Sequence, residues 1–283
     1  MIIDRILRKL PIFRGKQRLS KWLLKTEIES LKNIETEDKI GCKYLLPNIK
    51  ENIGFEIFIN AVYEPETIEL IIELLQPNAL FLDIGANIGA ISLPICKCRP
   101  DVSAYSIEAS PRVFEYLKIN THLNELSNCT VINKAISDID NQELNFYSPV
   151  DNYGKGSFAN VFTNDAERVT TITLDSLLSK YSIVNPDVIK IDIEGFEYVA
   201  FKGGVHALSK PDAPDIIFEF VDWAERLSKL CVAGGAQQQL LDYGYSLYEI
   251  KKSGKLKLRE TVITKGAAML LATKKNIGFG RIN

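Results

Sequence analysis

The sequence has few residues of the kinds that build metal centres or disulfide frameworks. Its 283 residues include two histidines and five cysteines. No two cysteines have the CxxC spacing of a zinc or redox site. The cysteines are Cys42, Cys96, Cys98, Cys129 and Cys231. We therefore expect free thiols in a reducing compartment, which predicts a cytoplasmic location.

Long apolar runs are also missing. No stretch approaches the roughly 18–20 apolar residues of a membrane-spanning helix, and charges and Pro11 interrupt the first residues, unlike a secretory signal. Residues 1–25 hold eight Lys or Arg and one acid, Asp4, with apolar residues on one helical face. Such a segment can pack on the domain or on a partner subunit, or it can lie on the anionic inner face of a membrane. The sequence leaves these alternatives open.

A strong net charge is absent as well, since the formal value is −2 at pH 7. The chain lacks a basic stretch interleaved with aromatic residues, so nucleic acid is not an expected partner. It has no internal repeat and no low-complexity linker. Its hydrophobic content of 46% is ordinary for a globular protein.

From residue 79 onward, apolar strands alternate with amphipathic helices. This βαβ succession predicts an α/β fold with a largely parallel sheet. The expected strands are Ala79–Asp83, Val102–Ile107, Val131–Ala135, Asp187–Asp192, Asp215–Phe220, Tyr245–Ile250 and Ala267–Thr273. The expected helices are Ile88–Cys98, Pro111–Asn120, Leu174–Lys180, Gly195–Leu208 and Trp223–Tyr243. Residues 1–60 are expected to form a helical, basic N-terminal extension to a domain of residues 61–283.

The first strand of this series runs into a glycine-containing turn of the kind found at nucleotide-binding sites. Small residues at Gly85, Ala86 and Gly89 let the backbone approach a ligand, and the following helix directs free N–H groups to the same place. The middle glycine of the dinucleotide fingerprint Gly-x-Gly-x-x-Gly is missing. The turn therefore favours a ligand with a nucleoside and an amino-acid tail, whose ammonium and carboxylate groups Asp83 and Asn87 could hold.

Polar side chains stand at the ends of several apolar strands, where ligands bind in such sheets. They are Asp83, Glu108, Ser137, Asp138, Asp192, Glu194 and Glu219. Glu108 lies 25 residues after Asp83, near the spacing at which an acid meets ribose hydroxyls in nucleoside-binding domains. Ser148–Glu167 is a polar loop of about twenty residues, long enough to be a lid or an acceptor site.

Six short motifs follow one another along the chain. They are Tyr63-Glu-Pro-Glu-Thr67, Asp83-Ile-Gly-Ala-Asn-Ile-Gly89, Ile107-Glu-Ala-Ser-Pro-Arg112, Ala135-Ile-Ser-Asp138, Thr173-Leu-Asp175 and Lys190-Ile-Asp-Ile-Glu-Gly-Phe-Glu197. In this order they resemble the FkbM family of S-adenosylmethionine-dependent methyltransferases. The resemblance covers roughly residues 62–274. It implies a Rossmann-like class I methyltransferase domain, with a seven-stranded, mostly parallel sheet, an antiparallel last strand and helices on both faces.

The resemblance also implies a set of residues that bind S-adenosyl-L-methionine. The turn would line the methionine part, the motif that contains Glu108 the ribose, and residues 135–137 the adenine. The set is Asp83, Gly85, Ala86, Asn87, Gly89, Glu108, Ala109, Ala135, Ile136 and Ser137.

Methyl transfer to a hydroxyl calls for a general base close to the acceptor. The two histidines, His122 and His206, are expected to be structural, so the base is expected among four residues of the strand ends. These are Asp192 and Glu194, with Lys190 and Glu219 as second candidates. The same acids could instead hold a divalent cation that lowers the acceptor pKa. The sequence does not decide between a base and a metal.

The leading hypothesis is an O-methyltransferase that acts on a hydroxyl of a sugar or glycan precursor. Its partner would then be a saccharide or another small molecule. Two alternatives remain. One is methylation of a nitrogen or hydroxyl on a different small molecule, and the other is a non-catalytic, cofactor-binding interaction module that uses the basic N-terminus.

Overall fold

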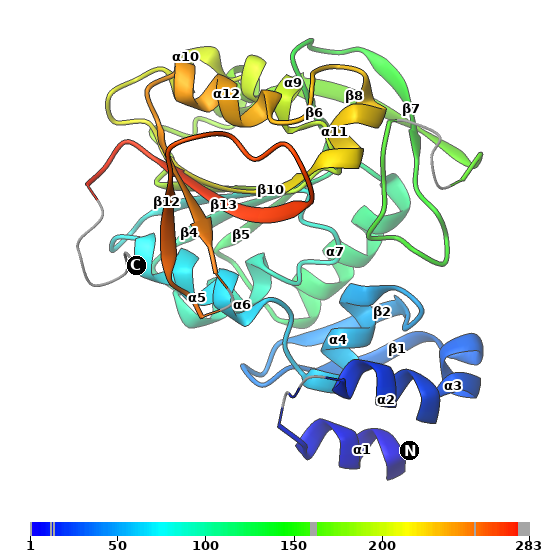
Figure 1. Ribbon diagram of the computed structural model, residues 1–283. Helices are drawn as coiled ribbons and strands as arrows, with labels where there is room; N and C mark the ends of the chain where they lie inside the picture. Colours follow the sequence, from blue (N-terminus) through cyan, green and yellow to red (C-terminus); the bar gives the residue numbers. More distant parts are fainter. Residues whose placement is uncertain (1, 12, 14, 159–162, 252, 277–283) are drawn as a thin grey trace.

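A computed structural model describes residues 2–11, 13, 15–158, 163–251 and 253–276. A central sheet of eight strands runs through the protein in the order β12-β11-β13-β10-β9-β3-β4-β5, with helices on both faces (Figure 1). The strands are β3 (Leu80–Ile84), β4 (Ser103–Glu108), β5 (Cys129–Asn133), β9 (Val188–Ile191), β10 (Asp215–Val221), β11 (Ser246–Ile250), β12 (Leu256–Arg259) and β13 (Ala267–Thr273). This mixed sheet agrees with the expected Rossmann-like α/β class.

The strands from β5 to β10 pair in parallel. The last strand, β13, runs antiparallel to both β10 and β11. Seven strands were expected, and the sheet holds one more. Strand β12 lies in the Lys-rich connection before β13 and pairs with β11 as an antiparallel hairpin.

Each face of the sheet carries its own hydrophobic core, because side chains alternate between the two faces along every strand. One core contains Phe81 and Val188 of the strands, and it is covered by α4 (Asn52–Asn60), α5 (Pro65–Leu74), α6 (Ser92–Cys98) and α7 (Pro111–Leu123). The other contains Leu82 and Ile189, and it is covered by α8 (Leu174–Lys180), α9 (Glu197–Lys202), α10 (Val205–Leu208) and α12 (Gly235–Asp242). A further helix, α11 (Asp222–Ser228), follows β10 directly.

Three additional strands form a small sheet in the order β6-β8-β7. They are β6 (Ala135–Ser137), β7 (Glu143–Tyr147) and β8 (Ala166–Thr173). Strand β7 pairs antiparallel with β8, so the two flank the long polar loop as a hairpin. The expected third strand, 131–135, is thus divided, and its end belongs to this small sheet.

The N-terminal extension contains helices and a two-stranded antiparallel sheet, β1-β2, so it is not purely helical. Its elements before α4 are α1 (Ile2–Lys9), α2 (Lys16–Leu23), α3 (Lys25–Ser30), β1 (Lys32–Glu37) and β2 (Lys43–Asn48). Leu7, Leu24 and Tyr44 are buried in the core that α4 and α5 also cover. The extension therefore packs on the domain, below it in Figure 1.

Three expected helices differ from the observed ones at their glycines. Helix α6 begins at Ser92 and not at Ile88, because Asn87 (φ 53°) and Gly89 (φ 89°) have left-handed backbone conformations that a helix cannot include. Each of the other two is divided into a pair, α9 with α10 and α11 with α12. The glycine-containing turn between β3 and α6 is consequently longer than the sequence indicated.

Candidate cofactor and active site

A pocket lies at the carboxyl ends of β3, β4 and β9, beneath the loop that connects β7 and β8. It is lined by Ile53, Tyr63, Ile84, Gly85, Ala86, Asn87, Ala90, Ile91, Ile107, Glu108, Ala109, Lys134, Ala135, Ile136, Phe146, Tyr153, Gly154, Gly156, Phe158, Lys190, Asp192, Ile193 and Glu194. Most of the expected cofactor-binding residues therefore surround one cavity.

The glycine turn packs directly on the chain that follows β9. A Cβ atom at Gly85 would lie 2.0 Å from the backbone oxygen of Asp192, and the φ of Gly85 is +80°. The N–H groups of Gly85 and Ala86 both donate to the carbonyl oxygen of Ile107, at 2.9 Å each. Only glycine fits position 85, and the turn ties the ends of β3, β4 and β9 together.

Glu108 is held as a buried acceptor at the end of β4. Its Oε2 accepts from the Asn87 N–H at 3.0 Å, and its Oε1 accepts from the Ser110 N–H at 2.8 Å. Burial raises the pKa of this carboxyl to about 7, although these two hydrogen bonds oppose the shift. A carboxylate oxygen can accept more than one hydrogen bond, so each oxygen retains capacity for a ligand hydroxyl.

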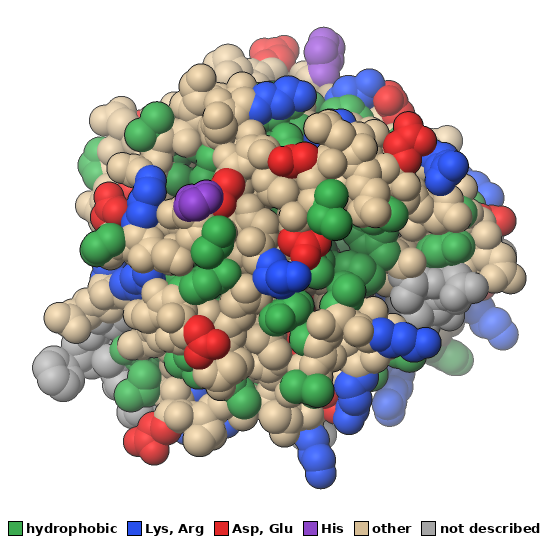
Figure 2. All heavy atoms as spheres, turned by 90° about the horizontal axis from the view of Figure 1, so that it is seen from above, with side chains coloured by type: hydrophobic (Ala, Val, Ile, Leu, Met, Phe, Trp, Pro, Cys, Tyr) green, Lys and Arg blue, Asp and Glu red, His purple; other side chains and the backbone are tan. Residues whose placement is uncertain are grey.

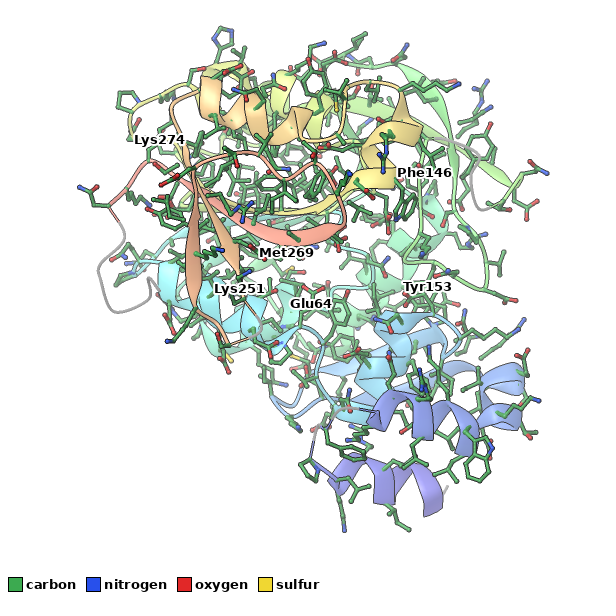
Figure 3. All side chains as sticks on the ribbon, viewed as in Figure 1. Glu64, Phe146, Tyr153, Lys251, Met269 and Lys274 are labelled. Atoms are coloured by element: carbon green, nitrogen blue, oxygen red, sulfur yellow. The ribbon has the colours of Figure 1, made fainter. Side chains whose placement is uncertain are left out.

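The sequence reasoning missed the aromatic side chains that cover the pocket. Phe146 and Phe158 pack edge to face with ring centroids 5.2 Å apart. The ring of Phe158 also packs against that of Phe196, with a distance of 4.8 Å between the centroids. Tyr153 is buried, and Figure 3 shows it and Phe146 on the side of the loop. Tyr153 and Phe158 in the polar loop and Phe146 just before it were the available signal, but the position of the loop residues depends on how the loop folds back.

Residues of the motifs 83–89 and 107–112, together with the N-terminal extension, hold this loop over the pocket. The Arg112 guanidinium donates to the Ser148 carbonyl oxygen, and the Ser110 hydroxyl donates to Glu167. The Asn87 amide donates to the carbonyl oxygen of Tyr153 at 3.1 Å. From the extension, the Asn48 amide donates to the Val150 carbonyl oxygen at 3.3 Å and Lys50 pairs with Asp151 at 3.2 Å. The loop is thus a cover fixed at both of its ends.

Lys190 is a buried cation in a cluster of carboxylates on one sheet face. It stands opposite Asp83 in the parallel register of β3 and β9, and its Nζ lies 3.2 Å from Asp192 Oδ2. Burial lowers the pKa of Lys190, but Asp192, Asp83 and Glu64 outweigh it and raise the pKa above its usual range. A lysine that holds its proton this firmly cannot accept another, which argues against Lys190 as the base.

Glu194 follows β9 in a left-handed backbone conformation with φ 52° and lines the pocket. Burial, reinforced by Asp192, raises the pKa of its carboxyl to about 7. Glu197 lies just behind, at the start of α9, where it accepts from the Ile193 N–H at 2.9 Å. Glu197 therefore fixes the turn, whereas Glu194 faces the cavity.

Four of the expected site residues do not line the pocket. Asp83 is fully buried beneath the turn, and no described residue hydrogen-bonds its carboxylate oxygens. Gly89 packs on Leu93, and the backbone of Ser137 lies against Gly203, the residue after α9. The last of the four, Glu219 on β10, has its pKa raised to about 8 by burial and by Asp192 and Glu194, yet it lies outside the cavity.

Neither the histidines nor a metal cluster belongs to the described site. Both histidines, His122 and His206, are exposed and lie apart at the surface (Figure 2). Within the ranges that the structure describes, no group of three or more His, Cys, Asp or Glu side chains could hold a metal ion. The divalent cation that the sequence left open as an alternative to a general base has no such ligand group among those residues.

The sheet order, the glycine turn and the pocket at the strand ends together define a Rossmann-like α/β protein with a nucleoside-type cofactor site. Residues 83–247, more than half of the chain, match the Methyltransferase FkbM domain. The chain belongs to this methyltransferase family.

One similar protein is the hexuronic acid methyltransferase AglP of Haloferax volcanii, 26% identical over 145 residues. The match spans 51% of this chain and 58% of that protein. Solved structures with a similar fold include a precorrin-6y C5,15-methyltransferase from Geobacter metallireducens (14% identity, TM-score 0.43, 76% of this chain and 93% of the other). A TehB-like SAM-dependent methyltransferase from Corynebacterium glutamicum is also similar (14% identity, TM-score 0.44, 75% and 89%). At these TM-scores the structural likeness adds nothing to the assignment of an acceptor.

Proposed function

We propose that the protein transfers a methyl group from S-adenosylmethionine to a hydroxyl of a saccharide or glycan precursor. The observation that carries the proposal is the presence, in one pocket, of two carboxylates with separate environments, Glu108 and Glu194. The similarity to a hexuronic acid methyltransferase supports a sugar acceptor. In this proposal, residues 1–60 are an extension and 61–283 the methyltransferase domain.

The pocket fits the three parts of the cofactor. Glu108, with one backbone N–H on each oxygen, suits a pair of vicinal ribose hydroxyls. The apolar wall of Ala135, Ile136, Phe146 and Phe158 suits a flat adenine ring. The backbone of the turn at 85–87 would hold the amino-acid tail. Asp83 is buried below the turn and would not touch the cofactor. It would instead help to hold Lys190 and the turn in place.

When bound, S-adenosylmethionine supplies the methyl group: its carbon–sulfur bond breaks, a carbon–oxygen bond forms to the acceptor, and S-adenosylhomocysteine leaves. Glu194 accepts the hydroxyl proton, because a carboxylate with a pKa near 7 is largely ionised at slightly alkaline pH and still basic enough to help. Lys190 positions Asp192 and offsets the negative charge of the cluster. Glu219 lies on the same face of the sheet, and its carboxyl group adds to the negative charge that Lys190 offsets.

Incubation with S-adenosylmethionine and a panel of methyl glycosides, uronic acids and small amines tests this function. We expect a mass gain of one methyl group on a saccharide, in a linkage that survives mild base, as an ether does. Methylation confined to the amines, or a base-labile ester on the uronic acids alone, would contradict transfer to a sugar hydroxyl.

We also propose that the N-terminal helices touch an anionic membrane surface. Among the described residues, no helix is long and apolar enough to cross a membrane. Large apolar side chains nevertheless remain exposed on the basic segment, including Ile6 (56%), Phe13 (44%), Leu19 (40%) and Trp22 (73%). A basic segment with apolar and Trp side chains in solvent is typical of interfacial binding. Buried Leu7 anchors the same segment to the domain.

Trp22→Ala is expected to weaken sedimentation with vesicles of phosphatidylglycerol and phosphatidylcholine by about tenfold, because the indole would no longer enter the interface. The matched variant Val232→Ala removes a side chain that is 79% exposed elsewhere, and it should bind vesicles like the parent. Equal binding of all three proteins would overturn the membrane contact.

A further inference from the structure

A second cavity adjoins the cofactor pocket on the side of the N-terminal extension. It is a groove of about 540 Å³, within the range of small-molecule sites. Its residues come from the α1–α2 connection and the start of α2, from α4, α5 and the connection between them, from the end of β11 and the residue after it, and from β13. Those used below are Asn60, Tyr63, Glu64, Lys251 and Met269. Figure 3 shows Glu64 beside Lys251 and Met269, where the extension meets the sheet.

The groove and the cofactor pocket share a wall. Tyr63 lines both cavities, and the adjacent residues Asn52 and Ile53 line one each. In the sheet order, the pocket lies at β9, β3 and β4 and the groove beside β11 and β13, so only β10 stands between them. A ligand in the groove would therefore face the carboxylate cluster around Lys190.

Two buried oxygen acceptors on the groove wall have no hydrogen-bond partner among the described residues. They are Oδ1 of Asn60, a residue only 8% exposed, and Oε2 of Glu64. Leaving a buried acceptor unpaired costs free energy, and proteins retain such groups where a ligand satisfies them. Both atoms accept hydrogen bonds, so they require a ligand that presents donors. Hydroxyl groups provide such donors.

The charges of the groove favour a neutral ligand over an anionic one. Three glutamates line it, Glu56, Glu64 and Glu66. Its two lysines already bond protein oxygens: Lys16 donates to the Leu10 carbonyl oxygen at 2.8 Å, and Lys251 pairs with Glu249. An added carboxylate would face three acids, which is unfavourable at close range.

We propose that this groove is the acceptor site and that it binds a neutral, hydroxyl-rich saccharide, whose hydroxyls donate to Asn60 and Glu64. The apolar surfaces of Tyr63 and Met269 would pack on the sugar ring. That the saccharide is the methyl acceptor rests on the proposed function, whereas saccharide binding to the groove does not. The extension would thus contribute acceptor specificity to the methyltransferase domain.

The test is the binding of methyl β-glucoside and methyl β-glucuronide by ligand-observed NMR, with the protein saturated with S-adenosylhomocysteine to fill the cofactor pocket. We expect the glucoside to bind at least tenfold more tightly than the glucuronide. Asn60→Leu should weaken glucoside binding at least tenfold, because the buried acceptor is gone. Glu64→Gln, which preserves size, should weaken it severalfold if Asn60→Leu does not fold.

The matched control Asn145→Leu changes an exposed asparagine on β7 and should bind the glucoside like the parent. The affinity for S-adenosylhomocysteine and the melting temperature report whether each variant is folded. Absence of glucoside binding to the parent protein, tighter binding of the glucuronide, or unchanged binding in both groove variants would each overturn the proposal. Failure of the parent to bind S-adenosylhomocysteine would instead count against the proposed function, and the glucoside titration without cofactor would still test the groove.

Discussion

Replacing Glu194 with glutamine is expected to lower kcat by about 10²- to 10⁴-fold, the usual contribution of a general base. The amide keeps the size of the side chain but cannot take the acceptor proton. The affinity for S-adenosylmethionine should change little, because Glu108 and the turn hold the cofactor in this account. Single-turnover methylation with quantified product measures the loss, and Glu115→Gln on the exposed face of α7 is the matched control.

The same carboxylate sets the expected pH dependence. The pKa of Glu194 is raised to about 7, so the fraction able to accept a proton grows as the pH rises through that value. At saturating cofactor, kcat should therefore increase with pH and level off above about 8. The rising limb should disappear in Glu194→Gln. A limb that persists unchanged in the variant would assign the base to another group.

Gly85→Ala should weaken S-adenosylmethionine binding by about 10²-fold and lower the free energy of unfolding by about 2–4 kcal/mol. The new methyl group would meet the Asp192 backbone oxygen at 2.0 Å, so the turn and the chain after β9 must separate. Calorimetry and thermal unfolding measure the two effects.

The control for this variant is Gly244→Ala. Gly244 has a similar φ of +88°, but apart from the residue itself and its two chain neighbours no atom of the described residues lies within 4 Å of the position of its Cβ. It therefore carries the backbone strain without the collision, and should lose about 1–2 kcal/mol of stability and no cofactor affinity. Equal losses in both variants would show that strain alone, and not the packing of the turn, explains the effect.

The sequence predicted the parts of the site that local pattern determines. Gly85, Ala86 and Asn87 follow a buried strand directly, and Glu108 ends the next one, so the parallel sheet brings them to one edge. Their place at the pocket follows from the alternation of strands and helices. The eighth strand escaped prediction because four residues in a Lys-rich connection give no periodic signal.

Whether a residue faces the pocket depends on side-chain direction or on distant contacts, which the sequence does not give. Asp83 and Glu108 both occur at strand ends, but Asp83 lies in register with Lys190 and enters the core instead of the pocket. Phe146 lines the cavity from β7, and Phe158 lines it from the loop. Contacts with Ser110, Arg112 and the extension hold that loop in place. No short-range pattern contains that information.

Titration of cofactor-free protein with S-adenosylmethionine in a calorimeter tests the central claim most directly. We predict one binding site per chain, with an affinity at least tenfold lower in Glu108→Ala, because two ribose hydroxyls would lose their acceptors. Absence of binding to the parent protein, or binding that Glu108→Ala leaves unchanged in a folded variant, would contradict the assignment of this pocket.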